Sequence, residues 1–91
     1  MNEDFLKQLR KRIEKIDKEI LKKLAERFAV AREIGRVKRE RGDGVEDEKR
    51  EAELRVFYRQ TAAEFGLDAD LVEKLFGFII SESKKLQDEV V

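Results

Sequence analysis

The sequence predicts an all-α fold of three helices, the first of them unusually long. Apolar residues recur at intervals of three and four along most of the chain, which is the period of an α-helix. The chain contains no proline, and Gly42, Gly44 and Gly66 separate the periodic segments. With 91 residues, the chain is short enough that we expect one domain over residues 1–91.

The first predicted helix runs from about Glu3 to Arg41. Its apolar stripe consists of Leu6, Leu9, Ile13, Ile16, Ile20, Leu24, Phe28, Ala31 and Ile34. Gly35 is tolerated inside this helix, and Gly42-Asp43-Gly44 ends it. At about 1.5 Å per residue, the helix would be close to 60 Å long.

Two shorter helices follow. The stripe of the second is Leu54, Phe57, Tyr58, Thr61, Ala62 and Phe65. We expect Gly66 to end it as a left-handed cap, and Asp68 is a favourable N-cap for the third helix. The stripe of the third helix is Val72, Leu75, Phe76, Ile79, Ile80, Ser83, Leu86 and Val90.

The length of the first helix predicts an oligomer. A compact domain of this size is only about 30 Å across, so two shorter helices of the same chain cannot cover the whole stripe. No proline is present to kink the long helix back on itself. We therefore expect an intertwined helical homodimer in which the long helices pair.

The amino-acid composition excludes several kinds of active site and binding partner. The chain has neither His nor Cys, which removes the usual general base, the thiol nucleophile and the usual zinc ligands, so we expect no metal and no cofactor. Its 21 basic and 21 acidic side chains give a net charge of zero, which argues against nucleic acid and anionic membranes as partners. No stretch approaches the roughly 20 apolar residues of a membrane span, and we expect a cytoplasmic protein.

The charged fraction is also informative. It is 46%, against about 25% in ordinary domains. Such a composition is typical of thermophile proteins, in which ion-pair networks are favoured. A long solvated helix surface in any organism would explain most of it as well.

Three groups of polar side chains lie where a packed helix would be apolar. Arg27 and Lys38 share a face of the first helix with Ile34, and Ser83 and Gln87 share a face of the third helix with Ile80. Asp47, Arg50 and Glu51 cluster in the first turn of the second helix. Each group has an ordinary explanation, because solvated cations are common in such a chain and acidic residues at a helix start complement its dipole. Together they predict a pocket. Since buried cations need a counter-ion, a small anionic ligand is the expected occupant.

Arg10 extends this argument to a second subunit. It lies about 25 Å before Arg27 along the same helix and on a different face, so one helix cannot direct both at one small ligand. In an antiparallel or crossed dimer, the N-terminal half of one long helix passes the C-terminal half of the other. Arg10 could then enter the pocket of the partner.

Short segments in a fixed order run through nearly the whole chain: Leu9-Arg10, Leu24-Ala25-Glu26-Arg27, Ile34-Gly35-Arg36-Val37-Lys38, Asp47 with Arg50-Glu51, Leu75-Phe76, and Ile79-Ile80 with Ser83 and Gln87. Together they resemble the all-helical chorismate mutase family. The resemblance implies an intertwined dimer and an isomerase that converts chorismate to prephenate in aromatic amino-acid biosynthesis, part of the shikimate pathway. It departs at Gly42-Asp43-Gly44, where relatives often have proline.

The resemblance also implies which residues carry the reaction. Arg27 and the partner's Arg10 would bind the two carboxylates of the substrate, with Ser83 assisting. Lys38 would contact a carboxylate and the ether oxygen, and Gln87 would donate to that same oxygen. The isomerisation takes place within one molecule, so the missing His and Cys are not needed.

The remaining residues would shape the pocket. Glu51 and the backbone near Asp47 would receive the ring hydroxyl of the substrate. Arg50 would brace the pocket, and Ile34 and Ile80 would form its apolar walls.

Two other functions remain open from sequence alone. An isochorismate pyruvate-lyase uses a similar scaffold and cationic pocket on a related enolpyruvyl ether. A non-enzymatic helical dimerisation module would have the same helices and would bind no dicarboxylate.

Overall fold

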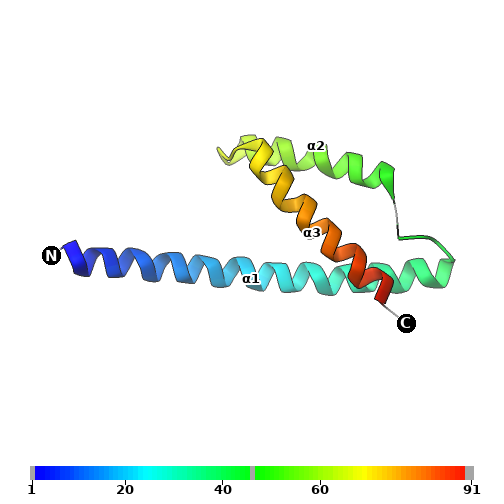
Figure 1. Ribbon diagram of the computed structural model, residues 1–91, viewed down its shortest axis with the longest axis horizontal. Helices are drawn as coiled ribbons and strands as arrows, with labels where there is room; N and C mark the ends of the chain where they lie inside the picture. The colour runs from blue at the N-terminus through cyan, green and yellow to red at the C-terminus, as the bar shows by residue number, and fades with distance from the viewer. Residues whose placement is uncertain (1, 46, 90–91) are drawn as a thin grey trace. The chain divides into compact units, whose positions relative to one another are not determined.

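The computed structural model describes residues 2–45 and 47–89 and contains three α-helices in this part of the chain (Figure 1). They are α1 (Asn2–Arg41), α2 (Glu48–Glu64) and α3 (Ala69–Glu89). The predicted all-α fold with a very long first helix is confirmed. Val90, the last residue of the predicted third stripe, lies outside the described residues. The chain divides into two compact units, an N-terminal unit of residues 1–30 and a C-terminal unit of residues 31–91.

The N-terminal unit is a helical run in which the middle of the apolar stripe is exposed. Glu3 and Asp4 lie in its first turn, where negative charge complements the helix dipole. Ile13 and Ile20, in the middle of the stripe, are 58% and 59% exposed. An isolated amphipathic helix of this kind gains most of its stability when the apolar face packs against something.

The end of α1 is fixed by a glycine cap, as the sequence predicts. Gly42 has a φ of +77°, which residues with a side chain rarely adopt. The N–H of Gly42 donates to the carbonyl of Arg39 at 3.1 Å, and the N–H of Asp43 donates to the carbonyl of Lys38 at 2.7 Å. This paired arrangement is the Schellman motif, and it turns the chain back alongside the last turn of α1.

The ends of the two shorter helices also follow local signals. Asp47 caps α2, its Oδ1 accepting from the N–H of Arg50 at 3.0 Å. Gly66 has a φ of +69° and ends α2 as expected. Asp68 accepts from the N–H of Asp70 at 2.9 Å and starts α3.

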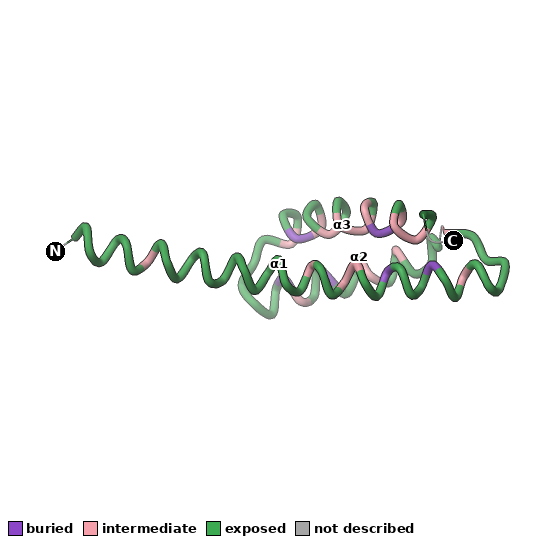
Figure 2. Tube along the Cα trace, turned by 90° about the horizontal axis from the view of Figure 1, so that it is seen from below, coloured by how far each residue is buried: buried purple, intermediate pink, exposed green. Residues whose placement is uncertain are grey.

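Helices α2 and α3 pack on one another around Tyr58, Ala62 and Val72. The ring of Tyr58 stacks on that of Phe76 with centroids 4.2 Å apart. The buried and half-buried positions of α3 lie on one side of the helix (Figure 2). At the rim of this core, Arg59 donates to Asp70 at 3.0 Å and to Glu73 at 2.8 Å.

The last turns of α1 meet the C-terminal end of α3 at a very close crossing. A Cβ atom built on Gly35 would lie 2.8 Å from both the Cα and the carbonyl oxygen of Gln87. Ala31, one turn earlier, is buried as well. Nearby, Arg39 Nη2 donates to the carbonyl of Asp88 at 3.1 Å. Gly35 is therefore required by backbone approach, a stronger role than the tolerance expected from sequence.

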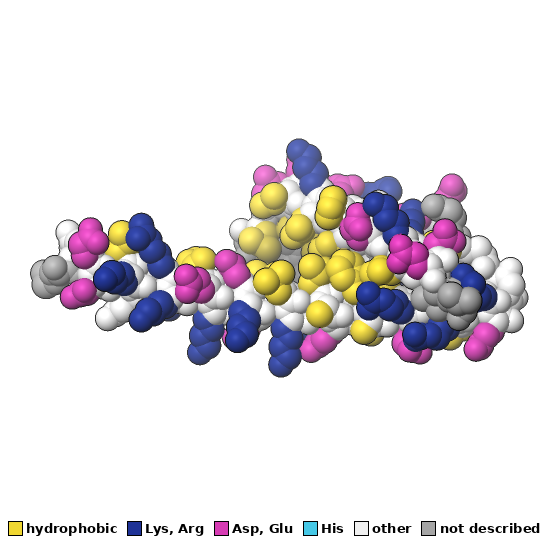
Figure 3. Space-filling view, turned by 60° about the horizontal axis from the view of Figure 1, so that its bottom comes forward, with side chains coloured by type: hydrophobic (Ala, Val, Ile, Leu, Met, Phe, Trp, Pro, Cys, Tyr) yellow, Lys and Arg dark blue, Asp and Glu magenta, His cyan; other side chains and the backbone are white. Residues whose placement is uncertain are grey.

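The C-terminal unit leaves large apolar side chains exposed. Leu71, Leu75 and Phe78 lie on one side of α3 and are all more than half exposed. Hydrophobic side chains gather on the face seen in Figure 3. Among the described residues, no helix combines the length and apolarity that crossing a membrane requires.

Candidate active site

The inner face of α3 carries the first group of predicted site residues. Ser83 is buried, with only 4% of its surface exposed, and its Oγ donates to the carbonyl of Ile79 at 2.8 Å. Ile80 is half-buried against the core between α2 and α3. The predicted face of Ile80, Ser83 and Gln87 thus consists of buried and half-buried positions.

Gln87 is the predicted site residue at the C-terminal end of this face of α3. Its Oε1 is buried and has no hydrogen-bond partner among the described residues. Leaving a buried acceptor without a partner costs about 1–3 kcal/mol. Because a side-chain amide carries both an acceptor and two donors, a half-turn of the group would present its N–H to a ligand.

Lys38 is a cation in the last turn of α1. It is half-buried, and its Nζ donates to the carbonyl of Val45 at 3.1 Å. That carbonyl carries no formal charge, and no carboxylate within the described part of the chain forms an ion pair with Lys38. A partly buried ammonium without a counter-ion favours the binding of an anion.

Helix α2 contributes Glu51 from its first turn. Glu51 is half-buried, and its Oε1 lies 2.7 Å from Nζ of Lys84 on α3. Asp47 is exposed and caps the helix. Arg50 is exposed too, and it lies 3.4 Å from Glu53 on the surface of α2. The bracing role implied for Arg50 therefore stays a prediction.

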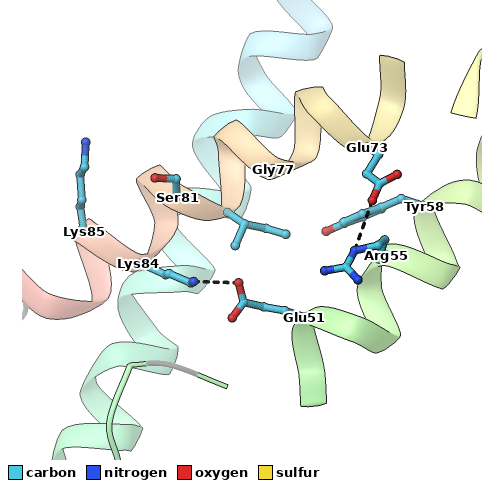
Figure 4. A pocket seen from close by; sticks show the side chains of 9 residues that line it. Glu51, Arg55, Tyr58, Glu73, Gly77, Ser81, Lys84 and Lys85 are labelled. Carbon is cyan, nitrogen blue, oxygen red and sulfur yellow. Dashed lines mark ion pairs between the residues drawn. The ribbon is translucent and has the colours of Figure 1, made fainter. Parts of the chain in front are cut away.

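A cavity of about 510 Å³ opens between α2 and α3. Helix α2 contributes Glu51, Arg55 and Tyr58 to its lining, and α3 contributes residues between Glu73 and Lys85. Figure 4 shows two ion pairs that cross it, Glu51 with Lys84 and Arg55 with Glu73. Ser83 and Gln87 do not line this cavity, so it adjoins the predicted site at Glu51 without containing the whole of it.

The other predicted residues belong to different surroundings. Arg10 is exposed and Arg27 half-buried, and both lie in the N-terminal unit. Ile34 is 42% exposed at the start of the C-terminal unit. Lys38, Glu51, Ser83 and Gln87 all lie in the C-terminal unit. The roles of all the predicted site residues stay predictions.

Sequence reasoning missed two residues of this region. A glycine inside a helical pattern is a known sign of close backbone approach, so Gly35 could have been found. Lys84 had no distinguishing signal, because lysine is frequent throughout this chain.

The sequence of this chain matches known proteins over nearly its whole length. Residues 9–88 match the family described as chorismate mutase type II. A protein of Methanocaldococcus jannaschii named chorismate mutase is 32% identical over 84 residues, which is 92% of this chain and 85% of that protein. The T-protein of Haemophilus influenzae is 31% identical over 80 residues, which is 88% of this chain and only 21% of that protein.

The family match extends across all three helices and includes every predicted site residue from Arg10 to Gln87. The first relative is similar over most of its own length. The chain therefore belongs to the type II chorismate mutase family.

Proposed function

We propose that this chain catalyses the rearrangement of chorismate to prephenate, using Lys38 and Gln87 as the groups that act on the breaking bond. The observation that supports this most strongly is the crossing of α1 and α3. There, the half-buried ammonium of Lys38 has no carboxylate partner within the described part of the chain, and the buried amide oxygen of Gln87 has no hydrogen-bond partner among the described residues. The two residues belong to turns at the close contact between Gly35 and Gln87. Membership of the chorismate mutase family identifies chorismate as the substrate.

The reaction asks little covalent chemistry of the protein. One C–O bond of the enolpyruvyl ether breaks while a C–C bond forms within the same molecule, and no proton or group is transferred to the enzyme. Negative charge develops on the ether oxygen as the bond breaks. Fixed donors aimed at that oxygen stabilise the transition state more than the ground state, and each such donor contributes about a hundredfold to a thousandfold in rate.

The substrate must also be held in a compact conformation. Its side chain is flexible, and the reacting carbons must approach each other for the new bond to form. In the proposed site, Arg27 and the partner's Arg10 hold the two carboxylates, and Glu51 receives the ring hydroxyl. Apolar contacts from Ile34 and Ile80 fill the remaining space.

A homodimer completes the site in this proposal. Its support is the exposed apolar surface, which includes Ile13 and Ile20 on α1 together with Leu71, Leu75 and Phe78 on α3. Large apolar side chains exposed together on one side of a helix are typical of an interaction surface. A second copy of the chain offers matching helices and brings Arg10 to the pocket.

Incubation with chorismate is the direct test of the proposed activity. We expect prephenate as the product, identified by liquid chromatography of the reaction mixture. Release of pyruvate and salicylate from isochorismate, with no prephenate from chorismate, would instead indicate the lyase. No turnover of either compound would indicate a non-enzymatic dimerisation module.

The amide at position 87 predicts a characteristic pH dependence. An amide does not titrate, so kcat should stay constant from mildly acidic to mildly alkaline pH. In Gln87→Glu, the side chain donates to the ether oxygen only while it is protonated. We expect kcat of this variant to fall about tenfold per pH unit above the pKa of the new carboxyl group, whose ordinary value is about 4.3.

Steady-state kinetics of both proteins across this pH range measures the difference. A wild-type kcat that falls with the titration of a single carboxyl group would contradict the role of Gln87. Gln8→Glu, on an exposed position of α1, is the matched control and should leave the profile flat.

Mixing two inactive variants tests the shared site. In a heterodimer of Arg10→Ala and Lys38→Ala chains, one pocket contains both replacements and the other contains neither. Random exchange makes half of the dimers mixed, so we expect about a quarter of the wild-type activity to return. If subunit exchange is demonstrated by mass spectrometry and no activity returns, Arg10 does not act in the partner's pocket.

A further inference from the structure

The ion pair between Lys84 and Glu51 is better shielded from water than a surface pair. The two side chains are 29% and 27% exposed, and Nζ lies 2.7 Å from Oε1. The neighbouring pair of Lys85 and Glu82 has side chains that are 66% and 38% exposed. Shielded pairs interact more strongly because less water screens the charges.

The geometry leaves half of the Glu51 carboxylate unused by Lys84. Figure 4 shows the Lys84 side chain extending from α3 toward Glu51 of α2. The ammonium contacts Oε1. A carboxylate has two oxygens that both accept hydrogen bonds, so Oε2 can accept from a further donor.

The ammonium of Lys84 and the carboxylate of Glu51 form an oppositely charged pair. A carboxylate accepts a stronger hydrogen bond from a hydroxyl group than a neutral acceptor does.

We propose that Lys84 is a positioning residue for substrate recognition. Its ammonium fixes Oε1 of Glu51, so that Oε2 is held ready to accept the hydrogen bond from the ring hydroxyl of chorismate. This inference rests on the proposed function. It adds a residue to the site, and it makes discrimination for the hydroxyl group depend on a side chain that does not touch the substrate.

A purely structural role would have different consequences. If Lys84 only joined α2 to α3, its loss would lower stability and would affect all substrates alike. If Lys84 positions Glu51, the loss is specific to substrates that carry the ring hydroxyl. A chorismate analogue that lacks this hydroxyl therefore separates the two roles.

The experiment compares Lys84→Met with Lys85→Met, an adjacent replacement of the same kind at a more exposed ion pair. KM and kcat are measured for chorismate and for the analogue without the hydroxyl. We expect Lys84→Met to raise KM for chorismate about tenfold, the loss of one charge-assisted hydrogen bond. It should leave KM for the analogue unchanged within about twofold. Lys85→Met should change neither value, and Lys84→Arg should restore most of the affinity for chorismate.

Each outcome bears on one proposal. An equal loss with both substrates, or no change in Lys84→Met, overturns the positioning role. Absence of wild-type turnover of chorismate overturns the proposed function itself, and it is established first. If Lys84→Met does not fold, Lys84→Gln replaces it, because a neutral polar group keeps contact with water while removing the charge.

Discussion

Lys38→Ala is expected to lower kcat for chorismate by about a hundredfold to a thousandfold, the effect of removing a principal donor to developing negative charge. The ammonium of Lys38 is half-buried and is held by the carbonyl of Val45. Since its partner in the structure is neutral, its charge is available to the ether oxygen and to a substrate carboxylate.

The same replacement should barely change stability. It removes one hydrogen bond to a carbonyl, worth about 1 kcal/mol, together with a partly desolvated charge whose removal is favourable. Chemical denaturation should therefore give a free energy of unfolding within about 1 kcal/mol of wild type. Steady-state kinetics measures kcat of the same variant with chorismate.

Arg41→Ala is the matched control for Lys38→Ala. Arg41 is an exposed cation at the end of the same helix, paired with Asp43 at 3.2 Å. We expect its kcat to remain near that of wild type. Equal losses in the two variants would mean that general positive charge at this end of α1 matters, and that Lys38 has no particular role.

Gly35→Ala is expected to lower both stability and activity, although alanine favours helices. The added Cβ would lie 2.8 Å from the backbone of Gln87, and backbone cannot rotate away as a flexible side chain can. Overpacking of this kind costs about 1–3 kcal/mol. Helix α3 must then shift and carry the Gln87 amide with it. A misplacement of about 1 Å costs about a hundredfold in rate.

Gly77→Ala separates the close contact from helix propensity. Gly77 lies within α3, and nothing comes within 4 Å of a Cβ built there. We expect this variant to gain up to about 1 kcal/mol from propensity alone. The midpoint temperature of thermal unfolding should fall for Gly35→Ala and rise for Gly77→Ala. A rise for Gly35→Ala would contradict the close crossing of α1 and α3.

Local signals were sufficient for the helices and their ends. Gly42 and Gly66 adopt the positive φ that ends a helix, and Asp47 and Asp68 cap the helices that follow. These features depend on residues within a few positions of one another, so periodicity and capping rules find them. The inward position of Ser83 follows from the same helical period.

Features that depend on contacts between helices were harder to predict. The ion pair of Glu51 with Lys84 joins residues on different helices, and neither residue type is distinctive in a chain with 46% charged residues. Arg50 lies one position before Glu51 and turns toward Glu53 on the surface. Helical period alone cannot decide which of two adjacent charged residues faces inward when both lie near the edge of the packed face.

The turn after α1 has a consequence for the thermodynamics of substrate binding. Lys38 is held twice by this turn, through its carbonyl by the N–H of Asp43 and through its Nζ by the carbonyl of Val45. A free lysine side chain loses up to about 2 kcal/mol of rotamer entropy when it is immobilised. Because folding has already restricted Lys38, that entropy is lost before the substrate arrives, and less of the binding free energy goes into ordering the cation.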